Sequence, residues 1–188
     1  MGPAMMGAAP ELMTSKNEES PAARRYRINL IVAHKPDGGA PIVFEDDPSH
    51  ARLVGRIEHR AEFGALSTDF SLIRGGALHR ANGGYLVIDA MRLLAEPFAW
   101  QALKQSLIRR SIRVESLSDR YSFASTQTLE PEPIPLNIKV ILIGEPRHYY
   151  LLKAYDADFS RLFKVAADFE DTFDRTDSAV SDFCRTVA

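Results

Sequence analysis

The stretch that decides the fold is Gly75–Leu94, GGALHRANGGYLVIDAMRLL. Two glycines, Gly83 and Gly84, lead into the apolar run Tyr85–Ile88, and the run ends at the carboxylate of Asp89. A short apolar run between turn residues is typical of a strand buried in the middle of a parallel sheet. Ligands of such sheets bind just beyond the carboxyl ends of the strands, so Asp89 is placed where a ligand or a metal ion would be met.

Two roles are open to Asp89. An aspartate that follows an apolar strand commonly caps the next turn. In a nucleotide-binding site, an aspartate in this position holds Mg²⁺ on the bound phosphates. The residue taken alone favours the cap, and the sequence around it favours the metal role.

That surrounding sequence carries a family resemblance. GALHRANGGYLVIDA resembles the approach to the Walker B strand in the Lon-like branch of the AAA+ ATPases, G-A-x-H-R-A-x-G-G-x-L-x-x-D. TLEPEPIPLNIKVILIG then resembles the family's T-x-x-P-x-P return into the next strand. The two motifs stand in the family's order, and the resemblance covers Tyr26 to Thr176, from Walker B to the arginine-finger region of LonB- and LonC-type proteases.

The resemblance implies an α/β fold. We expect part of a P-loop NTPase-like parallel sheet flanked by helices, with an inserted β-hairpin and without the strand that precedes the phosphate-binding loop. We predict a disordered tail over 1–25, the partial AAA+ core over 26–176, and the start of an incomplete helical lid over 177–188.

Composition fits one soluble domain. The 188 residues are 45% hydrophobic and 26% charged, and the 23 basic and 25 acidic residues give a net charge of −2. This balance does not favour nucleic acid as a partner. A single cysteine, Cys184, excludes an intramolecular disulfide, and no apolar stretch approaches the about 18 residues of a membrane span. We therefore expect a cytoplasmic protein.

Hydrophobic periodicity predicts the remaining elements. The expected strands are Tyr26–Val32 with Pro41–Phe44 as its neighbour, a long hairpin over 112–126, Ile138–Ile143, and a last strand over Val165–Phe169. The expected helices begin at Pro97, after a short connection that follows Asp89, and cover Pro146–Tyr155 and Ser178–Val187. In the helix from Pro97, Trp100, Leu103 and Leu107 form the apolar face and Lys104 lies off it. The helix from Pro97 closes with Arg109 and Arg110, which either complement its dipole or contact a nucleotide or a subunit.

Further site residues follow from the resemblance alone. In ring-shaped AAA+ unfoldases, an aromatic residue ahead of the Walker B strand grips the polypeptide in the pore, and this implies a substrate-binding role for Phe63 and Gly64. The alternative is that Phe63 packs in the core. A basic residue near the end of the module reaches the neighbouring subunit's nucleotide, which implies Arg161 or Lys164. The alternative for both is a surface cation.

Three histidines, His50, His59 and His79, raise the question of a zinc site. Their spacing matches no helical or knuckle pattern, and no cysteine is near. The sequence therefore does not predict metal binding by histidine.

Several residues that an active ATPase or serine protease needs are missing from the sequence. The chain contains no Gly-Lys dipeptide, so it has no Walker A loop. Ala90 stands where a catalytic carboxylate would orient water, and Gly144–Glu145 stands near the first-sensor position, where a negative charge would repel phosphate. No Gly-x-Ser-x-Gly elbow or serine–lysine peptidase motif is present. We predict that the chain alone hydrolyses neither ATP nor peptide bonds.

Three hypotheses about function remain. The first is a piece of the AAA+ module of a Lon-like ATP-dependent serine protease, with homo-oligomeric ring subunits and unfolded polypeptide as partners. ATP and Mg²⁺ are then cofactors of the complete module, with neither bound by this chain alone. The second is a stand-alone scaffold or interaction protein derived from a degenerate AAA+ core. The third is an enzyme of unknown type that uses Asp89, Glu58 and His79.

Overall fold

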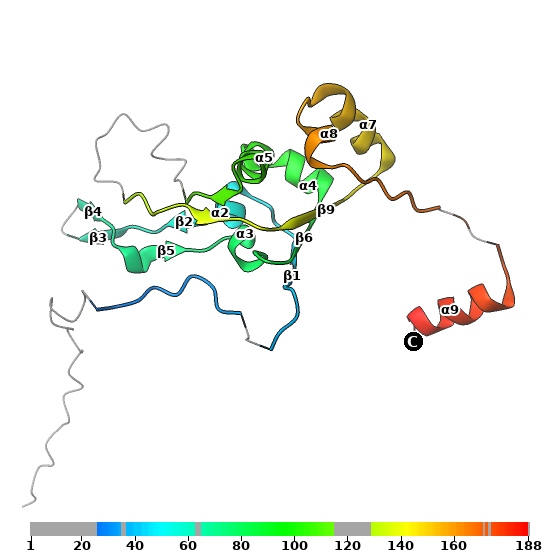
Figure 1. Cartoon of the computed structure of the whole chain (residues 1–188), viewed down its shortest axis with the longest axis horizontal. Helices are drawn as coiled ribbons and strands as arrows, with labels where there is room; N and C mark the ends of the chain where they lie inside the picture. The colour runs from blue at the N-terminus through cyan, green and yellow to red at the C-terminus, as the bar shows by residue number, and fades with distance from the viewer. Residues whose placement is uncertain are drawn as a thin grey trace, which may run out of the picture.

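The computed structural model describes residues 26–34, 37–62, 65–114, 129–170, 172 and 174–187. Its centre is a parallel three-stranded sheet in the order β1-β6-β9, formed by Ile42–Glu45, Tyr85–Asp89 and Lys139–Ile143 (Figure 1). The run that ends at Asp89 is therefore the middle strand, as predicted. The α/β class with a parallel sheet flanked by helices, a partial AAA+ fold, is confirmed.

Helices and short ladders complete the described part of the chain. The helices are α2 (His50–Val54), α3 (Ala77–Arg80), α4 (Ala90–Ala95), α5 (Ala99–Arg109), α7 (Pro146–Tyr155), α8 (Phe159–Leu162) and α9 (Asp177–Val187), with a 3₁₀ turn, η1, at Phe70–Leu72. The antiparallel pairs are β2 (Arg56–Ile57) with β5 (Ile73–Arg74), β3 (Arg60–Glu62) with β4 (Ala65–Ser67), and β7 (Ser111–Ile112) with β8 (Ile134–Pro135). No helix in these described stretches is long and apolar enough to cross a bilayer.

The core lies on one face of the sheet. Alternate side chains of a strand point to opposite faces, and Leu86 and Ile88 of β6 point to the covered one, where both are fully buried. Helices α2, α3, α4 and α5 supply the layer that covers this face, through Leu53, Leu78, Leu93 and Leu103. These leucines contribute about 1.5–3 kcal/mol each through burial.

The opposite face of the sheet is largely open in the described part of the chain, although Val87 at its centre on β6 is only 7% exposed. Phe44 on β1 is 69% exposed and Ile143 on β9 is 56% exposed, and Ile42 and Ile141 are exposed beside them. By alternation along β6, Asp89 belongs to this open face.

Two glycines allow β1 to approach β6. Gly83 has a φ of +85°, a left-handed conformation that glycine adopts without steric cost. At Gly84, a Cβ atom would lie 2.0 Å from the carbonyl oxygen of Pro41, which is the same oxygen that accepts the first hydrogen bond of the ladder, from Tyr85 N at 2.8 Å. Glycine at position 84 is therefore required by the close approach of the two strands.

The structure corrects two strand predictions. Residues 27–34 form no strand, and β1 pairs in parallel with β6 instead of with that segment. The segment is fixed by a side chain, because Asn29 Nδ2 donates to the carbonyls of Phe70 and Ile73 at 2.8 and 3.0 Å. The last predicted strand, Val165–Phe169, is also absent, and both of these end residues are almost fully exposed, so the apolar run packs against nothing described.

The other predicted elements have mixed outcomes. The strand and helix predicted over 138–143 and 146–155 are present as β9 and α7, and α9 lies where the last helix was expected. A helix, α4, follows Asp89 in place of a short connection. The predicted helix from Pro97 is α5, which begins at Ala99. Most of the long hairpin, and the tail over 1–25, lie outside the described residues.

Substituting Gly84→Ala tests the contact that sets β1 against β6. A methyl group there clashes with a backbone carbonyl, so we expect a loss of about 1–3 kcal/mol in the free energy of unfolding, measured by urea titration. Gly39→Ala is the matched control, because a Cβ atom at Gly39 meets nothing within 4 Å. We expect the control to change stability by less than about 1 kcal/mol. Equal unfolding midpoints for the two variants would contradict the strand contact.

Candidate functional site

Asp89 ends the central strand and starts the next helix. Its Oδ1 accepts a hydrogen bond from the backbone N–H of Arg92 at 2.9 Å, so the residue caps α4. No described residue donates to the second oxygen, Oδ2, and the side chain is exposed. The cap uses one carboxylate oxygen and leaves the other open to a ligand.

The neighbouring strand brings the predicted sensor position to the same edge. Ile143, the last residue of β9, pairs with Asp89, and Gly144 follows it. A Cβ atom on Gly144 would lie 3.1 Å from the Cβ of Ala90, which is almost fully buried. The glutamate at 145 is exposed and pairs with Arg147 at 2.8 Å. This edge therefore places Asp89, Ala90 and Gly144 together.

A buried glutamate holds the carboxyl end of the adjacent strand. Glu45, the last residue of β1, is 3% exposed, and its two oxygens accept from Arg52 Nε at 3.2 Å and Arg80 Nη2 at 2.7 Å. A buried carboxylate is costly unless it is paired and hydrogen-bonded, so both arginines are structurally required. Arg92 adds a bond to the backbone carbonyl of Asp46 at 2.9 Å. Together these bonds fix the ends of β1 and β6 beside each other.

The sequence reasoning missed Glu45. Its signal was present, because the apolar run of β1 ends at an acid in the same way that β6 ends at Asp89. Arg80 belongs to the same HRA segment that carries the family resemblance. The two residues are 35 positions apart, and nothing local in the sequence indicates that they pair.

The histidines do not form a common site. His79 is buried, its Nδ1 accepts from the backbone N–H of Gly76 at 3.1 Å, and burial together with the nearby Arg80 charge lowers its pKa to about 4. Within the described ranges, no three His, Cys, Asp or Glu side chains gather in a way that could hold a metal ion. Glu58 accepts hydrogen bonds from Arg74 at 2.9 Å and from Arg56 at 2.8 Å, and these bonds lower its pKa. Among the described residues, no hydrogen bond or ion pair joins Glu58 to Asp89 or His79.

Arg161 and Lys164 lie at the far end of the described core, on α8 and just after it. The Arg161 side chain is 63% exposed and pairs with Asp158 at 3.3 Å, and Lys164 is exposed. Their helix packs against α5 and α7. No contact within the described residues brings either cation to Asp89 of the same chain.

The connection between α7 and α8 is held to α5 by a polar contact that is largely shielded from solvent. Asp156 Oδ2 accepts from Lys104 Nζ at 2.6 Å and from Trp100 Nε1 at 2.7 Å. Burial raises the pKa of Asp156, but the hydrogen bonds from Lys104 and Trp100 outweigh it and hold the pKa below its ordinary value. The rings of Phe159 and Phe163 pack on Trp100, with centroids 6.3 and 5.9 Å away.

Lys104 corrects the prediction for this helix. The apolar periodicity placed Lys104 off the packed face of α5, yet the residue is only 7% exposed. Its ammonium group is paired with a carboxylate 52 positions away, which compensates its burial.

Residues 38–170 match the family described as the LonB-like AAA domain. The chain belongs to this family. It is 31% identical over 140 residues to a putative Lon protease homolog of Escherichia coli, a match that covers 70% of this chain and 22% of the relative.

Two archaeal proteins are also similar to this chain. The archaeal Lon protease of Thermoplasma acidophilum is 29% identical over 130 residues, covering 66% of this chain and 19% of the relative, and that of Thermoplasma volcanium is 28% identical over 117 residues, covering 61% and 17%. The LonB-like chain thus spans about a fifth of the length of these relatives.

The edge residues of this LonB-like domain can be tested for fit to Mg²⁺. Asp89 offers one open oxygen on a fixed backbone, and Mg²⁺ in nucleotide sites is bound by one or two carboxylates together with phosphate oxygens and water. Asp89 is therefore suited to be the single protein ligand of a Mg²⁺ ion. Phe63 and Gly64, the predicted substrate-binding pair, lie outside the described residues, and β3 and β4 pair antiparallel on either side of them.

Two substitutions separate the cap from the open oxygen of Asp89. Asp89→Ala removes the acceptor for Arg92 N, so we expect a loss of about 1 kcal/mol in the free energy of unfolding. Asp89→Asn retains an oxygen that can cap, so its stability should stay close to that of the wild type. Urea unfolding of the three proteins checks this. An equal loss in both variants would show that the cap is not what Asp89 contributes to stability.

Proposed function

We propose that this LonB-like domain supplies the carboxylate side of an ATP–Mg²⁺ site in the AAA module of a Lon-type protease ring. Asp89 is the metal ligand, and ATP and peptide bonds are not hydrolysed by this chain alone. One observation carries the proposal: the exposed carboxylate at the end of the central parallel strand keeps Oδ2 open while Oδ1 anchors α4.

Mg²⁺ bound at this edge would neutralise phosphate charge and orient the phosphates. The protein's own part is positional, because the Glu45 ion pairs and the Arg92 bonds hold the ends of β1 and β6 in register. Ala90 lacks the carboxylate that would orient an attacking water. The phosphate-binding loop must come from elsewhere, since the sequence has no Gly-Lys pair.

Ring assembly is part of this proposal, and the placement of the cations supports it. Arg161 and Lys164 are exposed, and no hydrogen bond or ion pair in the described part of the chain joins them to Asp89, so they are suited to a nucleotide held by another subunit. The open face of the sheet also supports action within a larger assembly, because parallel sheets normally bury both faces and Phe44 and Ile143 are exposed here.

Polypeptide handling is assigned to Phe63 and Gly64. They connect the paired strands β3 and β4, with Glu62 in register with Ala65. By the family resemblance, an aromatic side chain at this point of the sequence is suited to gripping an extended chain.

The nucleotide assignment is tested by titrating Mg–ATP into the ¹⁵N-labelled chain and following the amide signals by NMR. Half of a site should give a dissociation constant of about 1 mM, or about 4 kcal/mol of binding free energy. The shifts should centre on 89–92 and 144–145 and should require Mg²⁺. Asp89→Asn keeps the helix cap and should lose the Mg²⁺ dependence.

Asp37→Asn is the matched control for this titration, because it removes an exposed carboxylate in the turn ahead of β1. It should leave the response unchanged. Shifts that centre on other residues, or that persist without Mg²⁺ in the wild type, would contradict the role proposed for Asp89.

A further inference from the structure

A pocket lined by His79, here called the His79 pocket, lies at the opposite end of β6 from Asp89. Asn82 also lines it and precedes β6. Its Nδ2 donates to the carbonyl of Pro135 at 2.9 Å, and its Oδ1 accepts from the backbone N–H of Asn137, just ahead of β9, at 2.9 Å. The five residues of β6 rise about 3.3 Å each, so its two ends are about 13 Å apart. The pocket is therefore separate from the proposed nucleotide edge.

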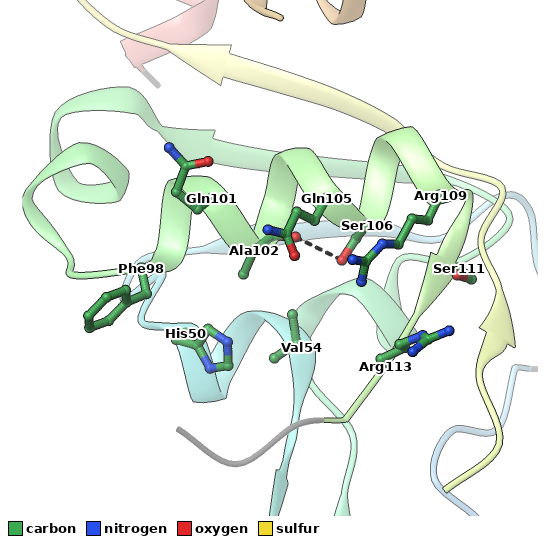
Figure 2. Close-up of a pocket in the computed structure, with 10 residues that line it drawn as sticks. All are labelled: His50, Val54, Phe98, Gln101, Ala102, Gln105, Ser106, Arg109, Ser111 and Arg113. Atoms are coloured by element: carbon green, nitrogen blue, oxygen red, sulfur yellow. Dashed lines mark hydrogen bonds between the residues drawn. The ribbon is translucent and has the colours of Figure 1, made fainter. Parts of the chain in front are cut away.

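The His79 pocket is large enough for a small molecule. Its free volume is about 380 Å³, within the range of about 300–1,000 Å³ that is typical of ligand sites. The groove between α2 and α5, shown in Figure 2, has a free volume of about 50 Å³, little more than the roughly 30 Å³ that one water molecule occupies in the liquid. Of these two cavities, the His79 pocket is the one with room for a ligand.

The lining of the His79 pocket favours an uncharged ligand. Ile31, Val32 and Ile134 supply apolar side chains, and no Asp, Glu, Lys or Arg is among the described residues that line it. A charged ligand loses its hydration on entering such a pocket and gains no ion pair there in return. The other described lining residues are Asn29, His34, His79 and Asn82.

One wall of the pocket packs closely beside His79. A Cβ atom on Gly75 would overlap with Ile31 Cγ2 and would lie 3.5 Å from His79 Cβ. Ile31 belongs to the segment that Asn29 anchors through its two hydrogen bonds to backbone carbonyls, at 2.8 and 3.0 Å. The wall is therefore held in place by the protein itself, which lowers the entropy cost of binding a ligand.

His79 carries a hydrogen-bond donor without an acceptor in the described part of the chain. The residue is 5% exposed, and its Nδ1 accepts from the backbone N–H of Gly76 at 3.1 Å. A neutral imidazole whose Nδ1 accepts a bond carries its proton on Nε2. Nε2 is buried, and no described residue accepts from it. A buried donor without an acceptor is unfavourable, so a ligand that supplies an acceptor gains affinity from this bond.

We propose that the His79 pocket binds a small uncharged ligand that has an apolar body and a carbonyl oxygen. The carbonyl oxygen accepts from His79 Nε2, and the apolar body packs against Ile31, Val32 and Ile134. A carboxylate could accept the same bond but would lose its hydration without an ion pair. A hydrocarbon would fill the pocket and leave Nε2 without an acceptor. Because this site needs neither nucleotide nor Mg²⁺, it can fail while the Asp89 assignment holds, and the reverse is also true.

Three probes that share one ring test the ligand class. Benzamide is uncharged and has a carbonyl oxygen, benzoate is charged, and toluene has no acceptor. NMR of the uniformly ¹⁵N-labelled chain follows the imidazole nitrogens and the backbone amides. Benzamide should shift the His79 Nε2 signal saturably, with a dissociation constant of about 1 mM. Benzoate and toluene should bind at least about tenfold more weakly, which corresponds to the loss of about 1.4 kcal/mol.

A substitution that fills the pocket locates the site. V32W places a bulky ring in the lining and leaves His79 unchanged, so benzamide should bind at least about tenfold more weakly. L30W is the matched control, because Leu30 belongs to the same segment, is 71% exposed and is not among the lining residues. It should bind benzamide like the wild type.

A second pair of variants tests the donor. H79F keeps a ring and removes Nε2–H, so the amide signals of 31, 32 and 82 should respond to benzamide and to toluene with equal affinity. H59F removes an exposed histidine outside the lining and should retain the preference for benzamide.

Circular dichroism checks that each variant is folded, and V32W against L30W decides the site if H79F is not. Three results would overturn the proposal: no saturable response of the wild type to benzamide, benzoate or toluene binding as tightly as benzamide, or V32W binding benzamide like the wild type.

Discussion

The packing of β6 between two parallel neighbours is the constraint on which the rest of the structure depends. Leu86 and Ile88 are buried on one face, and the strand can enter the sheet only because Gly84 lets the Pro41 carbonyl approach to hydrogen-bonding distance of Tyr85 N. The strand then ends at the edge where β1 and β9 also end, so its last residue is presented to solvent at a fixed position. A position fixed by packing is what a metal ligand needs.

The chemistry of this edge follows from how its charges are divided. Glu45 is buried and fully used by Arg52 and Arg80, so it contributes architecture. Asp89 is exposed and uses one oxygen to start α4, so it keeps capacity for a ligand. The cap and the proposed metal role therefore coexist in one carboxylate. In the proposed role, the Asp89 carboxylate would help to shape a phosphate site. It would not hold a nucleotide tightly without a phosphate-binding loop.

The sequence predicted the sheet because its signals are local. The apolar run of β6 is buried, that of β9 is partly buried on one side, and Pro146 marks the start of α7 in its first turn. The sequence signals gave wrong predictions where the structure depends on a residue far away in the sequence. The alternation around Ile28 has no strand beside it, and the burial of Lys104 depends on Asp156, 52 positions away. Helix α4 was not predicted because its only start signal is Asp89, and an aspartate in this position is equally typical of the end of a strand.

The central claim is that this LonB-like chain carries only the carboxylate side of a nucleotide site. Calorimetric titration of ATP into the isolated chain with excess Mg²⁺ tests it most directly. The account predicts no saturable heat at ATP concentrations up to about 100 µM, because a ligand-bearing edge without a phosphate cradle lacks the roughly 4 kcal/mol that separate millimolar from micromolar affinity. A saturable dissociation constant in the micromolar range would contradict it, since it would require a complete phosphate-binding site within these 188 residues.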